Sequence, residues 1–355
     1  MFRPAGGLFE AYSPAPLNDA AVPPFAALEA DEDEESQAEG RDFDFEMPQH
    51  AWRPLPASAP PDDAPVRFVD GSIVSRTVGC ITVAYRRRPL IAATVSAAAL
   101  EIEGRSLRRG AAVARKLLCL NSNGIDPAHL MDAKETLAAL GVELKTSEAE
   151  QPSDFDSMRR SSRAIAMIAM EEAERDVMLA GAARPTLVDG LLERRLAGGK
   201  HDLPVVGLVK RQIASYLPPG LQELAYSLKP GERTPAFVLA TVQHVDIVNC
   251  YVRLSSQAGA SPSYGIVRLT APLEYVARHH GGDELAPYLS GLAGYVYSLR
   301  HRDLAYDRAG ISIEPIVRFE EQLHALRPNI DVLIQKLHRQ LQPLQREVTG
   351  SLARD

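Results

Sequence analysis

The sequence predicts an α/β fold in which a β-sheet is flanked by helices. Short runs of β-branched and aliphatic residues bounded by turn residues are typical of strands, and longer segments with helical apolar spacing lie between them. The chain has 355 residues, 45% of them hydrophobic. It is therefore long enough to bury a core in one large domain or two ordinary ones.

The first 64 residues differ in composition from the rest of the chain. They are rich in Pro, Ala, Asp and Glu, and the acidic run at residues 31–35 carries much of the excess behind the formal net charge of −7. Such a composition buries little apolar surface. We therefore predict a flexible, non-catalytic, acidic and Pro-rich arm over residues 1–64 and a folded domain over residues 65–345.

Local patterns place the elements of the folded domain. The expected strands are residues 66–69, 78–85, 90–95, 186–188, 205–209, 236–242, 250–254 and 265–269. The expected helices are residues 107–120, 127–140, 157–179, 285–304, 316–326 and 330–341. The first two helices predict a helical insertion around residues 105–150.

The sequence lacks the signals that are typical of several classes of protein. The three cysteines have no CxxC spacing, and an odd number suits neither a disulfide framework nor a zinc site, so we expect a reducing cytoplasm. No apolar run approaches the ~20 residues that cross a bilayer, and no signal peptide is recognisable, so we expect no membrane association. The absence of P-loop, GxGxxG, HExxH and GxSxG motifs argues against ATP hydrolysis by this chain and against several other activities.

Clusters of arginine could hold a phosphate backbone. They lie at residues 86–88, 159–160 and 194–195. Solvated surface charge is the alternative interpretation for each cluster.

Two expected strands, about 120 residues apart, each end in Asp followed by Gly: Asp70 with Gly71, and Asp189 with Gly190. If these strands are neighbours, the two carboxylates meet, and glycine lets the backbone turn sharply beside a bound phosphate or ion. Paired carboxylates attract Mg²⁺ or Mn²⁺, which prefer oxygen ligands. The alternative is that each Asp-Gly pair only makes a turn.

A third carboxylate could come from the helix before Asp189, which carries Glu171, Glu172 and Glu174. Glu172 follows Ile165 and Ile168 by seven and four residues, so it shares their face and is expected to point toward the sheet. Glu171 and Glu174 are expected to face solvent, although a shift of about one residue in helical phase would exchange these roles. A solvated acidic helix end is the alternative for all three.

Two further side chains are candidates for the chemistry. Lys210 follows the strand at residues 205–209, where its ammonium group could contact the scissile phosphate or its leaving oxygen. A strand-end lysine in water is the alternative. His301 could be a metal ligand or a proton donor, although a lone histidine is more often structural.

Six segments resemble, in the same order, those of the NurA nucleases. They are FVDGS at 68–72, LVDG at 187–190, VGLVK at 206–210, GERTP at 231–235, YVRL at 251–254 and GIVRL at 265–269. The similarity spans residues 66–326 and rests on order and spacing, because no single segment is specific.

The resemblance implies a ribonuclease H-like mixed sheet, a homodimeric ring, dependence on Mn²⁺ or Mg²⁺, and partnership with a hexameric HerA-type DNA translocase in DNA end resection, repair or defence. Asp70 and Asp189 match the family's metal-binding aspartates, Glu172 or Glu171 its third acid, and Lys210 its strand-end lysine. His301 departs from the family's spacing after the Tyr-rich segment at residues 295–297. Two functions stay open: a metal-dependent deoxyribonuclease, or a related scaffold that has lost catalysis and serves as a DNA-binding or assembly subunit.

Overall fold

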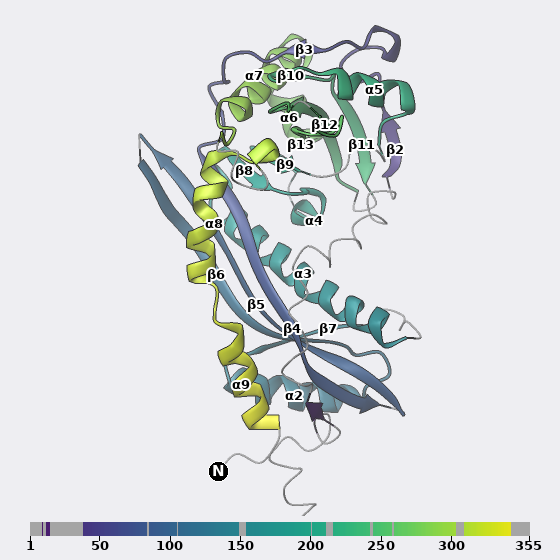
Figure 1. Cartoon of the computed structure of the whole chain (residues 1–355), viewed down its shortest axis with the longest axis vertical. Coiled ribbons are helices and arrows are strands. Elements are labelled where there is room, and N and C mark those ends of the chain that lie inside the picture. Colours follow the sequence, from purple (N-terminus) through teal and green to yellow (C-terminus); the bar gives the residue numbers. More distant parts are fainter. Residues whose placement is uncertain are drawn as a thin grey trace, which may run out of the picture.

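A computed structural model describes residues 9, 12–14, 38–83, 85–104, 106–148, 154–199, 201–210, 216–241, 244–257, 259–302 and 309–341. Within these residues a mixed sheet of 13 strands extends through the molecule, and helices cover both of its faces (Figure 1). The main path through the sheet has the order β2-β11-β12-β13-β9-β8-β4-β5-β6-β7. The expected class, an α/β fold with a sheet flanked by helices, is confirmed.

Three long antiparallel strands form one half of the sheet: β4 (Arg67–Val83), β5 (Arg86–Glu103) and β6 (Ser106–Asn121). The strands expected at residues 66–69 and 78–85 are parts of one strand, so β4 continues through Asp70 instead of ending there. The helix expected at residues 107–120 is wrong, because this segment is β6. Pairing with β5 along most of its length overrides the apparent helical spacing.

The helical insertion expected around residues 105–150 therefore reduces to one helix, α2 (Pro127–Ala139), which begins after Asp126. The Asp126 side chain accepts a hydrogen bond from the Ala128 amide at 2.8 Å, as an N-cap residue does. After α2 the chain adds β7 (Glu143–Ser147), which runs parallel to the end of β6.

The other half of the sheet holds the remaining expected strands. The strand β8 (Thr186–Asp189) lies between β4 and β9 (Val205–Val209) and is parallel to both. The strand β13 (Ile266–Pro272) is antiparallel to β9, and β12 and β11 follow it. The bounds of the other strands are β1 Ser13–Pro14, β2 Ala38–Asp42, β3 Leu55–Pro56, β10 Glu232–Arg233, β11 Phe237–Thr241 and β12 Asp246–Arg253.

The expected long helix is confirmed as α3 (Phe155–Leu179), which packs on one face of β4, β5 and β6. The opposite face of the sheet is covered by helices from the C-terminal part of the chain, with α8 lying along the long strands (Figure 1). The remaining helices are α4 Glu193–Leu196, α5 Pro219–Ser227, α6 Leu273–His279, α7 Leu285–Ser298, α8 Glu314–Leu326 and α9 Ile330–Leu341. In the part of the chain described, no helix is long and apolar enough to span a membrane.

Residues 38–64, assigned by composition to a loose arm, instead contact the folded domain. The strand β2 extends the sheet by pairing with β11. The Glu46 carboxylate makes a bidentate ion pair with Arg233, with distances of 2.6 and 2.8 Å, and also accepts the Ala236 amide at 2.6 Å. Both charged side chains are almost fully buried, at 0% exposed for Arg233 and 3% for Glu46. The acidic run at residues 31–35 lies outside the described residues.

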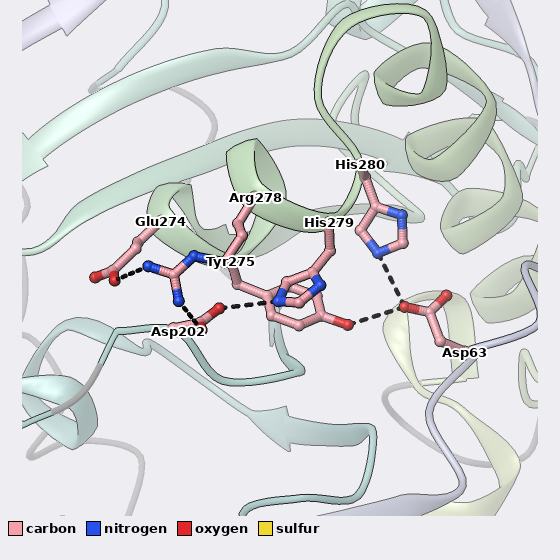
Figure 2. Close-up of polar contacts among 7 residues, drawn as sticks. All are labelled: Asp63, Asp202, Glu274, Tyr275, Arg278, His279 and His280. Atoms are coloured by element: carbon pink, nitrogen blue, oxygen red, sulfur yellow. Dashed lines mark hydrogen bonds and ion pairs between the residues drawn. The ribbon is translucent and has the colours of Figure 1, made fainter.

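The end of this segment is attached to α6 (Figure 2). Asp63 accepts a hydrogen bond from the Tyr275 hydroxyl at 3.0 Å and lies 2.9 Å from Nε2 of His280. On the other side of α6, Asp202 contacts both Arg278 and His279, and thereby holds the loop that leads into β9.

We expect Glu46→Ala to destabilise the domain by about 3–5 kcal/mol, because it leaves the Arg233 guanidinium buried without its counter-charge. Urea unfolding followed by circular dichroism measures the change. Glu103→Ala is the control, because Glu103 pairs with exposed Arg108 at 3.1 Å and such surface pairs contribute about 0.2–1 kcal/mol. An equal, small loss of unfolding free energy in both variants would show that the buried Glu46–Arg233 pair is not what attaches residues 38–64 to the domain.

Candidate active site

Two aspartates meet because their strands are parallel neighbours. Val69 of β4 is paired with Val188 of β8, so the following residues, Asp70 and Asp189, lie at the same level of the sheet. Strand alternation sets their common face. Since each aspartate directly follows one of these paired valines, the two side chains share a face of the sheet.

Lys210 completes this strand-end group. It follows β9, and its ammonium Nζ lies 2.5 Å from Oδ2 of Asp189. The Lys210 side chain is 8% exposed and that of Asp189 is 18% exposed, so the pair is largely shielded from water. Lys210 therefore supplies a positive charge beside Asp189.

The Asp70 carboxyl is held in an environment that disfavours its charge. Burial raises its pKa well above the usual value, repulsion from Asp189 raises it further, and attraction to Lys210 only partly offsets these effects. Glu174 adds a second repulsion, and the Gly71 amide donates a hydrogen bond to Oδ1 at 2.8 Å. Asp70 would therefore be stabilised by a proton or a cation.

The glutamate that lies with the aspartates is Glu174, and the expectation that Glu172 would do so is wrong. Glu174 is buried, and a Cβ built on Gly71 would overlap its carboxylate. The absence of a side chain at Gly71 thus lets a carboxylate from α3 enter beside Asp70. Burial raises the pKa of Glu174, while Arg195 lowers it.

The phase of α3 explains the error. Ile168, which we expected to be buried, is 44% exposed, whereas the stripe Ala169, Ala173 and Val177 is fully buried against the sheet. Small side chains let the helix approach the alanine-rich strand β5 closely, so packing selects the alanine stripe over the larger isoleucine. Glu174 follows Ala173 and shares its buried side.

Glu172 and Glu171 face elsewhere. The Glu172 carboxylate lies 2.6 Å from Nζ of Lys145 and 3.7 Å from Arg115, and it is 46% exposed. Glu171 pairs with Arg194 at 3.1 Å. Both are partners in ion pairs on the outer part of α3 and not members of the buried group.

Arg195 is a member of the site that the sequence argument did not single out. It comes from α4, is 5% exposed, and its Nε donates to Oε2 of Glu174 at 2.7 Å, with Nη2 contacting the same oxygen. A Cβ on Gly190 would come within 3.3 Å of its guanidinium, so the Asp189-Gly190 turn packs directly on it. The signal was its membership of the arginine pair at residues 194–195.

His301 contacts a different part of the molecule. Its Nδ1 lies 2.5 Å from the Glu314 carboxylate, and its amide donates to the Ser312 carbonyl at 2.8 Å. These contacts attach His301 to the start of α8 and do not bring it to the aspartates.

The carboxylates have the donor chemistry of a hard divalent cation. Among the residues that the structure describes, no three His, Cys, Asp or Glu side chains form a ready-made set of metal ligands. However, Mg²⁺ is commonly bound through one or two carboxylates with water and substrate phosphates as the other ligands. Asp70 and Asp189 fit that pattern, because among the described residues no cationic side chain forms an ion pair with the Asp70 carboxylate.

Comparisons with known proteins give a distant structural likeness. No protein-family model and no curated protein matches the sequence. Among solved structures, the chain is similar to the NurA nuclease from Sulfolobus solfataricus, with 12% identity, a TM-score of 0.40, and coverage of 82% of this chain and 89% of that one. This likeness is too distant to assign an activity.

We expect Asp70→Asn to raise the melting temperature in the absence of divalent ions. The folded protein raises the Asp70 pKa, so ionisation costs stability as pH rises from about 3.9, the unfolded value, through the folded pKa. The gain in the variant should be largest above the folded pKa and vanish below about pH 4. Thermal unfolding in EDTA between pH 4 and 8 measures it.

Asp132→Asn, at an exposed position of α2, is the matched control and should leave the melting temperature unchanged. A lower melting temperature for Asp70→Asn at pH 8 would show that the Asp70 charge stabilises the fold.

Proposed function

We propose that this chain is a metal-dependent nuclease that hydrolyses the phosphodiester backbone of DNA. The observation that carries the proposal is the adjacent pair Asp70 and Asp189 on the neighbouring parallel strands β4 and β8, with Lys210 beside Asp189. Carboxylates held together against their repulsion are typical of cation sites in phosphoryl-transfer enzymes. The site residues also belong to the segments that resemble the NurA nucleases.

Each side chain has a distinct role in this proposal. Asp70 and Asp189 would hold Mn²⁺ or Mg²⁺, which when bound activates water and stabilises the leaving oxygen. Lys210 would exchange its contact with Asp189 for a scissile phosphate oxygen and stabilise the charge that develops there. Glu174, paired with Arg195, would orient a metal-bound ligand. His301 has no role in this proposal, because its side chain contacts Glu314 at the start of α8.

The finer features of the proposal rest on the sequence resemblance. They are a ribonuclease H-like sheet, assembly as a homodimer, a cytoplasmic location, and action in DNA end resection, repair or defence with a HerA-type hexameric translocase. Co-purification with such an ATPase tests the partnership separately from the chemistry.

We expect Asp70→Asn and Asp189→Asn each to lower the rate of Mn²⁺-dependent cleavage of end-labelled DNA by at least about 100-fold, because each removes a charge that the cation needs. Glu174→Gln should lower the rate by about tenfold or more. Glu172→Gln is the matched control and should change it less than about twofold, since its carboxylate pairs with Lys145 and Arg115. Full activity in both aspartate variants would exclude this site.

A second test uses the glycine that admits Glu174. We expect Gly71→Ala to slow cleavage by about tenfold or more, because the added Cβ must displace the Glu174 carboxylate. Gly220→Ala is the control, since a Cβ at Gly220 meets nothing within 4 Å. Unchanged rates and unchanged Mn²⁺ affinity in Gly71→Ala would remove Glu174 from the mechanism.

A catalytically inactive DNA-binding or assembly subunit is the second candidate. The observation that favours it is that two of the three acids are already neutralised within the protein, Asp189 by Lys210 and Glu174 by Arg195. Tight DNA binding without cleavage at any Mn²⁺ or Mg²⁺ concentration, with or without the ATPase, would support this candidate over the nuclease.

A further inference from the structure

The turn between β4 and β5 breaks the usual preferences of a hairpin. Val83 is paired with Arg86, and Tyr85 lies in the tight turn just before Arg86. Tyr85 has a φ of 63°, in the left-handed region that favours glycine or asparagine. A bulky side chain in that conformation is strained.

No packing compensates for this strain. The Tyr85 side chain is 103% exposed, so its ring contacts nothing that would stabilise it in the folded protein. The turn projects from the lower right of the molecule in Figure 1, at the end of the two long strands and clear of the helices. A residue that violates a local rule with no gain in stability is a candidate for a binding function.

Two arginines follow Tyr85 directly in the chain. Arg86 and Arg87 are exposed, and in the described part of the chain neither forms an ion pair with a carboxylate. Arg88, by contrast, is buried, with its guanidinium bonded to the carbonyls of Asn121 and Asn123, so it anchors the strand beneath the turn. The tip therefore presents one aromatic face and two available guanidinium groups.

We propose that Tyr85, Arg86 and Arg87 form a nucleic-acid contact in which the tyrosine ring stacks on an unpaired base and the arginines bind the flanking phosphates. Stacking on an exposed aromatic residue beside basic side chains is how proteins bind single strands without reading sequence. The choice of nucleic acid over other polyanions rests on the proposed function. The evidence for base stacking and phosphate binding comes from the hairpin alone.

This contact is remote from the carboxylates. The strand β4 continues thirteen residues beyond Asp70 to Val83, which is about 43 Å of strand contour. The tip therefore acts on affinity and not on the hydrolytic step. A substrate must be long enough to reach from the site to the turn, or lie on the turn in a separate binding event.

The experiment is fluorescence anisotropy of a labelled 30-nucleotide single strand with the full chain in EDTA, where binding is measured without hydrolysis. Tyr85→Ala should weaken binding by about tenfold, and Tyr85→Phe should leave it nearly unchanged. Tyr85→Gly should weaken binding equally while raising the melting temperature by a few degrees, because it relieves the backbone strain. A structural role for the tyrosine would give the opposite change in stability.

The arginines are tested by salt dependence. Arg86→Ala with Arg87→Ala should reduce the slope of log affinity against log salt by about 1.4, the value for two lost single-strand phosphate contacts. Arg108→Ala with Arg109→Ala removes the same charge from exposed positions of β6 and should change the slope less. An equal change in this control, or Tyr85→Ala binding like the wild type, would overturn the proposal.

Two outcomes separate this inference from the proposed function. Tyr85-dependent binding by a chain that cleaves no DNA would uphold the contact and reject the nuclease. Cleavage with normal binding in Tyr85→Ala would uphold the nuclease and reject the contact. Tyr85-dependent binding to phosphatidylserine vesicles, with no effect on the oligonucleotide, would also reject it in favour of a lipid surface.

Discussion

Repulsion among neighbouring carboxylates is the constraint around which this part of the structure is arranged. Asp70, Asp189 and Glu174 converge where β4 and β8 run side by side, and burial raises the pKa of both Asp70 and Glu174. Buried charges are costly unless they are paired. Lys210 and Arg195 meet two of the three acids, and each comes from an element that follows β8 in the chain. Among the described residues Asp70 is the acid of the three without an ion pair, which is why we place the ion there.

The sequence predicted the parts of the site that depend on strands. Local pattern correctly ended strands at Asp189 and just before Lys210, but it also ended a strand at Asp70, where β4 continues to Val83. Their proximity was an inference from topology, and the parallel order β4-β8-β9 supplies it. Strand alternation then fixes the common side of the sheet, because it has a period of two and tolerates no drift.

The predictions that were wrong depend on how different segments of the chain pack together. The choice of Glu172 used Ile168 as a marker of the buried face of α3, but the helix packs through its small alanines and leaves Ile168 half exposed. Hydrophobicity alone does not show that a stripe of small side chains packs closer to a sheet than a stripe of large ones. Similarly, β6 looked helical because its pairing with the preceding strand β5 is not encoded in its own local spacing. Arg195 was missed since its partner, Glu174, was assigned to solvent.

Crystallography with Mn²⁺ tests the central claim most directly. Crystals of the full chain soaked in Mn²⁺ should show an anomalous peak within about 2.5 Å of carboxylate oxygens of both Asp70 and Asp189, with the Lys210 ammonium moved away from Asp189. Saturating Mn²⁺ that leaves no peak between the two aspartates, with the Lys210–Asp189 ion pair intact, would contradict the assignment of this carboxylate group as a catalytic cation site.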